Sequence, residues 1–278
     1  MIEPLSRPAG GGEAVRLQGE SNDEPQCHQG ELGPQPTVEL ELLGGFALRT
    51  DGRELQPTVG ARRLLALLAV EPNGMTRSRA AAVLWPQLDP ARAGAALRTA
   101  LHRLPGERAH LVDSTPERLR LAPHITVDLV ERRAVAAQLL NLALPMGAEE
   151  LSRAISCELG TDLLADWEED WLSHHQVRWR QLRLHALEAL SARLSEAGWA
   201  GAAVDAALVA IHSDNLRESA HETLVAAYLA AGNQIAAHAY RISYRELLQR
   251  ELSAAAPGLW SNLPAAPDRP GGRLRRLN

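Results

Sequence analysis

The stretch TRSRAAAVLWPQLDPARAGAALRTALHRL, residues 76–104, decides the fold. It contains two N-cap signals, each a side-chain oxygen placed just before a run of residues with helical spacing. Thr76 predicts the start of one helix, which Pro86 stops after Trp85, and Asp89-Pro90 predicts the start of the next. Two short helices joined by a tight turn are typical of a helix-turn-helix.

The second of these helices carries different side chains on its two faces. Small and apolar residues spaced by three and four positions form one stripe and are expected in the core: Ala93, Leu97, Leu101 and Leu104. The opposite face and its flanks carry one alanine among polar and basic residues: Arg92, Ala95, Arg98, Thr99, His102 and Arg103. Pro105-Gly106 ends the helix. This helix therefore has one face for a core and one for a partner.

Strand patterns precede the helix-turn-helix. Residues 38–42 alternate apolar and acidic side chains, and a second short run covers residues 46–49. Asp51-Gly52 then predicts a hairpin, because both residue types tolerate positive φ, and residues 53–55 return as the next strand. The chain thus opens with a small antiparallel sheet.

Two further patterns complete this half of the chain. From Gly60 the spacing is helical, with Leu64, Leu67 and Leu68 on one face, and Pro72 closes this segment. Residues 110–113 and 118–121 are short strand-like runs on either side of a turn at residues 114–117. The order sheet, three helices, hairpin is that of a winged helix, in which the last hairpin is the wing.

The rest of the chain, to about residue 256, is almost entirely helical in pattern. A shift of 34 residues aligns Leu190 with Leu224 and Ala197-Gly198 with Ala231-Gly232. That period is the tetratricopeptide one, in which pairs of antiparallel helices stack. We therefore predict a mainly α protein with a small β component, a winged helix-turn-helix domain followed by an all-α tetratricopeptide-like domain, with helices near 129–142 and 168–186 before the repeat.

The composition changes at both ends of the chain. Residues 1–36 contain a glycine triplet, scattered prolines and acids, and almost no apolar periodicity, so we expect a disordered acidic tail. Residues 258–278 have the same character with basic residues, which predicts a disordered basic tail. Between the tails we expect a winged-helix DNA-binding domain over residues 37–127 and a helical-repeat domain over residues 128–257.

The net charge of −5 is unevenly distributed along the 278 residues. Residues 38–128 carry 12 arginines and 10 acids, a net +2, whereas residues 129–257 carry a net −6. The leading 37 residues carry −4 and the last 21 carry +3. A polyanion would therefore bind the first half of the chain rather than the second.

Several short motifs resemble those of the Streptomyces antibiotic regulatory protein family of bacterial transcriptional activators. In the first half they are Leu42 to Phe46, Gly60 to Leu68, Leu84-Trp85-Pro86 and Ala96 to Leu104. In the second half they are Gly160 with Leu163-Leu164, Asp170-Trp171-Leu172, Leu216-Arg217-Glu218, Ala220-His221, Ala239-Tyr240 with Tyr244 and Leu247, and Glu251-Leu252. The resemblance covers roughly residues 38–257, and its specificity lies in the order of the motifs.

The resemblance implies an OmpR-like winged helix that binds direct repeats near promoters on double-stranded DNA. It also implies a bacterial transcriptional activator domain behind the winged helix. By the same resemblance, that domain mediates homodimerisation on DNA and contact with RNA polymerase.

The candidate DNA-binding residues follow from the chemistry of the grooves, where arginine reads guanine bidentately and threonine or histidine makes adaptable contacts. On the recognition helix they are Arg92, Thr99 and His102 toward base edges and Arg98 and Arg103 toward phosphates. On the wing they are Arg118 and Arg120, and on the first helix Arg62 and Arg63. The alternatives are a solvated helix face, ordinary exposed strand charges on the wing, and a structural role for one of Arg62 and Arg63.

No pattern in the chain predicts catalysis, a cofactor or a metal site. The acidic residues 166–170 lie at an expected helix start, where carboxylates favour the helix dipole, and the adjacent pair His174-His175 diverges on a helix. Apolar runs are interrupted well before the roughly 18 residues of a membrane span. Cys27 and Cys157 lie in no metal-like spacing and fit a reducing cytosol. We expect a cytoplasmic protein that is neither an enzyme nor a membrane protein.

Two hypotheses remain from the sequence. The first is a sequence-specific DNA-binding transcriptional regulator, an activator. The second is a helical-repeat interaction scaffold whose winged helix binds protein or binds DNA only weakly, because a net +2 over 91 residues is modest. Steep salt dependence of DNA binding favours the first, and salt-insensitive capture of a protein favours the second.

Overall fold

The computed structural model describes residues 37–106 and 110–254. Both predicted tails therefore lie outside the described residues. The first sheet has the strand order β3-β2-β1-β7, with β1 antiparallel to β2 and parallel to β7. Its strands are β1 Val38–Glu41, β2 Ala47–Thr50, β3 Arg53–Leu55 and β7 Thr126–Val127.

The hairpin predicted at Asp51-Gly52 is confirmed. Both residues have positive φ, 50° and 74°, and β2 pairs antiparallel with β3 across them. The pairing of β1 with β7 was not predicted. A two-residue strand carries no alternation of its own, so only the neighbouring strand marks it.

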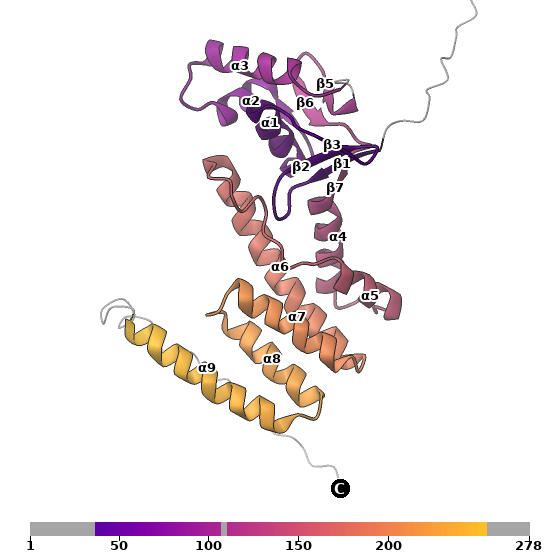
Figure 1. The fold of residues 1–278 in the computed structure, drawn as a ribbon, viewed down its shortest axis with the longest axis vertical. Coiled ribbons are helices and arrows are strands. Elements are labelled where there is room, and N and C mark those ends of the chain that lie inside the picture. The colour runs from indigo at the N-terminus through magenta and orange to yellow at the C-terminus, as the bar shows by residue number, and fades with distance from the viewer. Residues whose placement is uncertain (1–36, 107–109, 255–278) are drawn as a thin grey trace, which may run out of the picture. The chain divides into compact units, whose positions relative to one another are not determined.

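Three helices follow the first hairpin (Figure 1). They are α1 Val59–Val70, α2 Arg77–Leu84 and α3 Pro90–His102. Both predicted caps are confirmed, because the Thr76 hydroxyl accepts from the amide of Arg79 and the Asp89 carboxylate accepts from the amides of Ala91 and Arg92. The local signals in residues 76–104 therefore set where both helices begin.

A second sheet closes this half of the chain, with the order β4-β6-β5. Its strands are β4 Met75–Thr76, β5 Val112–Ser114 and β6 Arg118–Leu121. The predicted hairpin is β5–β6, and the unpredicted β4 pairs with β6 directly before α2. The described residues thus follow the element order that we expected for a winged helix.

The remaining elements described are helices (Figure 1). They are α4 Asp128–Leu140, α5 Ala148–Ser156, α6 Asp170–Glu196, α7 Ala200–Ser213, α8 Glu218–Ala230 and α9 Gln234–Ala254. The helices expected near 129–142 and 168–186 are α4 and α6, but α6 runs on to Glu196, and α5 was not predicted.

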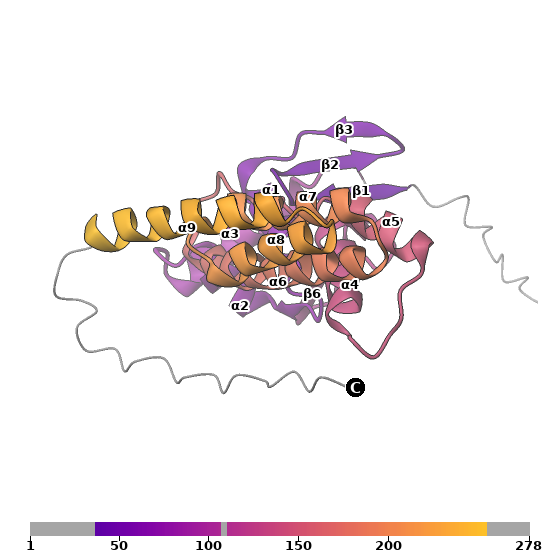
Figure 2. The ribbon, with the colours of Figure 1, turned by 90° about the horizontal axis from the view of Figure 1, so that it is seen from below.

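Each of the last three helices contacts the one before it, from α6 through to α9. In both ribbon views α9 lies along α8 (Figures 1 and 2). Gly198 and Gly232, the two glycines that the 34-residue shift aligns, end the turns after α6 and α8 with φ of 79° and 72°. The repeat in the sequence therefore corresponds to two matching helix ends.

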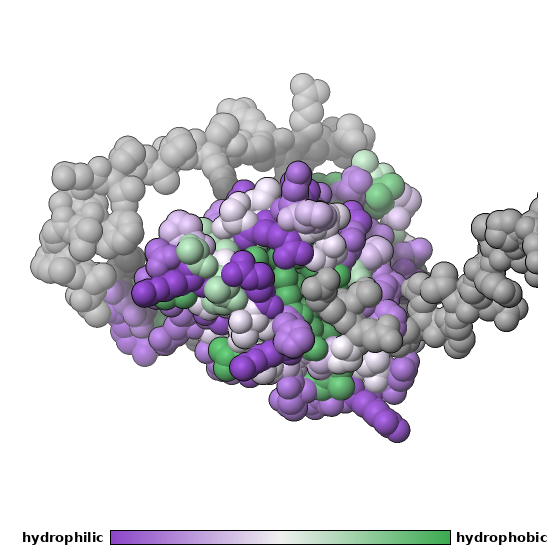
Figure 3. Space-filling model, turned by 90° about the horizontal axis from the view of Figure 1, so that it is seen from above, coloured by the Kyte–Doolittle hydropathy of each residue, from purple (hydrophilic) through white to green (hydrophobic). Residues whose placement is uncertain are grey.

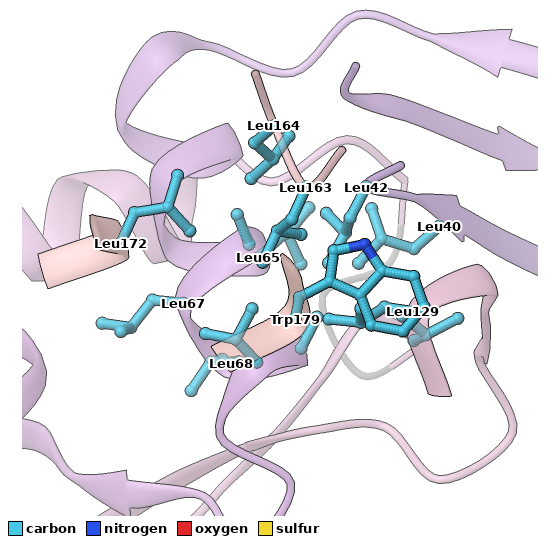
Figure 4. Packing of buried hydrophobic residues seen from close by; sticks show 14 of the residues in the cluster. Leu40, Leu42, Leu65, Leu67, Leu68, Leu129, Leu163, Leu164, Leu172 and Trp179 are labelled. Atoms are coloured by element: carbon cyan, nitrogen blue, oxygen red, sulfur yellow. The ribbon is translucent and has the colours of Figure 1, made fainter. Parts of the chain in front are cut away.

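One apolar core joins the two predicted halves of the chain (Figure 4). Leucines from α1 and β1 contact residues of the helical half; the labelled members of this cluster are Leu40, Leu42, Leu65, Leu67, Leu68, Leu129, Leu163, Leu164, Leu172 and Trp179. Full burial of each large apolar side chain stabilises the fold by about 1.5–3 kcal/mol. The boundary predicted between residues 127 and 128 is thus crossed by continuous hydrophobic contacts.

Backbone hydrogen bonds reinforce that junction. The amide of Gly44 donates to the carbonyl of Asp162, and the amide of Leu164 donates to the carbonyl of Leu42, both at 2.8 Å. The Asp128 carboxylate accepts from the amides of Leu42 and Leu43 at 2.9 Å. Burial raises the pKa of Asp128, and these amides oppose that shift. The segment after β1 is therefore held by the helical half.

Candidate nucleic-acid interface

Helix α3 has the two faces that its sequence predicts. Its apolar stripe is buried: Ala93, Leu97 and Leu101, followed by Leu104 just beyond the helix. The opposite face, polar except for one alanine, is exposed: Arg92, Ala95, Arg98, Thr99 and His102, followed by Arg103 at the C-cap. The cap by Asp89, with Pro90 at the first turn, fixes where the helix begins, and burial of the apolar stripe points the opposite face outward.

The exposed side chains of α3 are mostly free to meet a ligand. Within the described residues no hydrogen bond or ion pair engages the side chains of Arg98, His102 or Arg103. Arg92 makes only a solvent-exposed pair with Asp89, 3.3 Å from Nε to Oδ2. Thr99 donates to the carbonyl of Ala95 at 3.1 Å, which leaves its hydroxyl oxygen able to accept.

The hairpin β5–β6 stands beside α2 and is tied to it. Arg77 at the start of α2 donates from Nε to the carbonyl of Thr115 at 2.8 Å and from Nη2 to Ser114 Oγ at 2.5 Å. Arg118 donates to the carbonyls of Asn73 and Gly74 at 3.2 and 3.3 Å. The wing is therefore held in place by arginines.

The two predicted wing arginines are exposed but already have partners. Arg118 is bound to the turn before β4, and Arg120 donates from Nη2 to Asp113 Oδ2 at 3.1 Å. Surface pairs of this kind are worth only about 0–1 kcal/mol. A phosphate can therefore compete for either guanidinium.

Arg62 and Arg63 lie elsewhere, in the contact between α1 and the start of α6. Arg63 Nη2 donates to Glu169 Oε2 at 2.7 Å, and its side chain is 20% exposed. The Arg62 guanidinium lies over the rings of Phe46 and Trp167, 5.2 and 5.7 Å from their centroids. Both arginines are engaged inside the molecule, so we do not include them in the DNA-facing set.

Helix α2 adds basic residues that the sequence analysis did not single out. Arg79 is exposed in the first turn of α2, one residue after Ser78 and two after Arg77. Residues 76–104 contain five arginines and a single acid, Asp89. The net +2 of the whole segment conceals this local concentration, which a count over the helix-turn-helix alone would have found.

Figure 3 views the molecule from the end that carries α3. A hydrophobic strip crosses this end and is bordered by hydrophilic residues.

Comparison with known proteins assigns the helical half. Residues 127–259 match the family model of the bacterial transcriptional activator domain. The second half of this chain is therefore similar to the activator domain of bacterial transcription regulators, as its motifs predicted. No curated protein matches the sequence.

A solved structure of Mycobacterium tuberculosis EmbR in complex with a low-affinity phosphopeptide resembles this chain, with a TM-score of 0.62 and 19% sequence identity. The similarity covers 78% of this chain and 61% of the EmbR chain. At this identity the likeness shows a shared fold. This chain thus spans less than two thirds of that protein.

Two other kinds of feature were sought in the part of the chain that the structure describes. Residues 37–106 and 110–254 contain no helix that is long and apolar enough to cross a bilayer. The same residues hold no group of three or more histidines, cysteines or acids placed to bind a metal ion. Among the described residues, the candidate site is therefore the exposed basic face of α3 together with Arg79 at the start of α2.

Proposed function

We propose that this protein is a sequence-specific DNA-binding transcriptional activator. Residues 37–127 act as an OmpR-like winged helix, and residues 128–257 act as the activator domain. The observation that carries the proposal is a capped helix whose exposed face is basic, in a chain whose other half matches a transcriptional activator domain. The cytoplasm is where such a protein meets its promoters.

Helix α3 is the recognition helix in this proposal. Its exposed Arg92, Thr99 and His102 reach base edges in the major groove, where arginine pairs with guanine in a bidentate manner. Arg98 and Arg103 on the flanks contact phosphates, as does Arg79 at the start of α2. All six side chains are exposed, which supports their access to DNA.

The wing supplies weaker contacts. Arg118 and Arg120 extend from one face of β6, and each would exchange a surface partner for a phosphate. Because such an exchange yields little net energy, the wing contributes less to affinity than the helix.

The modest net charge favours binding as a dimer. Two copies on direct repeats gain affinity through effective concentration without any new contact. RNA polymerase is then the second partner, reached through the activator domain.

The test is to incubate the purified protein with fragmented genomic DNA from its source, recover the bound fragments and sequence them. The expected result is a shared direct-repeat motif upstream of genes. No enrichment over input by a folded protein at low salt would contradict the proposal.

One observation favours the scaffold as a second candidate. Leu229 on α8 and Ile235 on α9 are 51% and 85% exposed, and Ile242 lies on the same helix as Ile235 with 45% exposed. Exposed apolar side chains on neighbouring helices are typical of a surface for a protein partner. Partner capture that does not change between low and high salt, without DNA enrichment, would support this candidate.

A further inference from the structure

A large pocket lies between α2, α3 and the turn of the β5–β6 hairpin. Its volume is about 710 Å³, within the range of sites for small organic molecules. Its walls are formed by Arg77, Ser78, Ala81, Ala82, Trp85, Pro86, Leu88, Pro90, Ala93, Gly94, Leu97, Arg98 and Pro116.

The walls of this pocket, which we name the α2–α3 pocket, are held in place without a ligand. Pro116 comes from the hairpin turn, and the two hydrogen bonds from Arg77 to residues 114 and 115 tie that turn to α2. Pro86 and Pro90 restrict the backbone of the connection between the helices. A preformed site loses little conformational entropy when it binds.

The lining has one sign of charge. Apart from Ser78, every lining residue is apolar or is an arginine, and no lining residue is acidic. Arg77 already donates to the hairpin. The Arg98 guanidinium has no partner among the described residues and lies over Gly94, with Nη1 3.7 Å from the position that a Cβ there would take. Neither arginine is paired with an acid, but only Arg98 has a guanidinium without a hydrogen bond, so the pocket complements an apolar molecule whose anionic group meets Arg98.

We propose that the α2–α3 pocket binds a small apolar molecule bearing one carboxylate or sulfonate group, whose anion pairs with Arg98. Trp85, Leu88 and Leu97 contact the apolar body of the ligand. The consequence for DNA rests on the proposed function: Arg98 is a phosphate contact there, so the bound anion competes with the DNA backbone and weakens DNA binding.

Two fluorescent probes of nearly identical shape test the pairing. Anilinonaphthalene sulfonate carries the anion, and N-phenyl-1-naphthylamine is its uncharged counterpart. Each is titrated into the full chain and into the Arg98→Gln variant. The expected result is a loss of about 2–5-fold in affinity for the sulfonate, the size of one exposed ion pair, and no change for the neutral amine. An equal effect on both probes, or no effect on either, would overturn the pairing.

Filling the pocket tests its location. Gly94→Leu on α3 and Ala82→Phe on α2 enlarge side chains at two lining positions on different helices, and replacing a helical glycine does not cost helix stability. Ala137→Phe on α4 is the matched control, because Ala137 is exposed and far in sequence from every lining residue. Both filling variants should lose at least 10-fold in affinity for both probes, with unchanged circular dichroism, while the control binds as the parent does. Probe binding that survives in both filling variants would place the probes elsewhere and overturn the proposal.

Competition separates this inference from the proposed function. With an enriched DNA fragment in hand, the sulfonate should weaken DNA binding of the parent and not of Gly94→Leu. If the parent binds DNA and the sulfonate fails to bind, the inference fails and the proposed function stands. If the sulfonate binds with the expected variant pattern and no DNA is ever enriched, the proposed function fails and the pocket stands.

Discussion

Two pairs of arginines in the first half of the chain look alike in sequence and differ in the fold. Arg62 and Arg63 open a helix, and Arg98 and Arg103 flank one. The first pair is engaged by Glu169 and by two aromatic rings, whereas the second pair has no partner among the described residues. The difference lies in what packs against the start of α1: Trp167 and Glu169 from the helical half and Phe46 from the first half. Arginine on a helix surface predicts a ligand only when no other part of the chain reaches it.

The largest expected effect is a loss of stability when an apolar side chain is removed from the buried face of α3. Packing of this face turns Arg98 and Arg103 toward solvent. Leu101 is 2% exposed, so Leu101→Ala leaves a cavity and should lower the free energy of unfolding by about 2–5 kcal/mol. Urea denaturation followed by circular dichroism measures it. A midpoint equal to that of the parent would mean that this face is not the one in the core.

The next effect concerns base discrimination. Arg92→Ala should reduce the difference in binding free energy between specific and random DNA by about 1–3 kcal/mol, because a bidentate contact to a guanine would be lost. Fluorescence anisotropy with an enriched fragment and a scrambled one measures it. Equal loss on both fragments would make Arg92 a phosphate contact instead.

A smaller effect separates the first pair from the second. Arg63→Met keeps most of the apolar stem and removes the bond to Glu169, so it should lower stability by about 1 kcal/mol. Affinity for DNA should stay within twofold of the parent. A DNA affinity that falls while stability holds would return Arg63 to the DNA-facing set.

The matched variant on α3 should behave in the opposite way. Arg103→Ala is expected to leave the free energy of unfolding unchanged and to lower the affinity for specific and random DNA equally. It should also reduce the slope of log affinity against log salt by about 0.9, the share of one phosphate contact. An unchanged slope would show that Arg103 stays in solvent in the complex.

The smallest expected effect is a pH dependence of stability, which arises at His175 on α6 and its neighbour Glu71 at the end of α1. Burial lowers the pKa of His175 on α6 from its ordinary value of 6.5, against the opposing effect of Glu71, whose Oε1 lies 3.7 Å from Nε2. A histidine with a lowered pKa binds fewer protons folded than unfolded, so stability should fall as the pH drops through 6.5. Urea midpoints at pH 7.5 and 5.5 should differ less in His175→Gln than in the parent. An identical difference in the two proteins would remove His175 as a cause.

Much of the first half was predictable because its signals are local. Thr76 and Asp89 cap their helices through amides two or three residues away, and Asp51-Gly52 turns the chain within one hairpin. The rotation of α3 follows from its own apolar spacing. These features depend on neighbours in the chain, so a single sequence contains them.

The features that were missed depend on distant partners. Strands β4 and β7 have two residues each and exist because β6 and β1 pair with them. The role of Arg63 depends on Glu169, which is more than 100 residues away. The α2–α3 pocket needs Pro116 beside Trp85. Periodicity and spacing carry no information on such pairs.

By itself, the sequence determined most of the longer elements and their order, the caps of α2 and α3 and the two faces of α3, because short-range hydrogen bonds and apolar periodicity set all of these. Only the tertiary structure decided which arginines are free, how one core joins the two halves, and that a pocket with an unpaired Arg98 opens beside α3. A guanidinium can pair with an acid, an aromatic ring or a phosphate, and the fold of the rest of the chain decides which of these lies beside it.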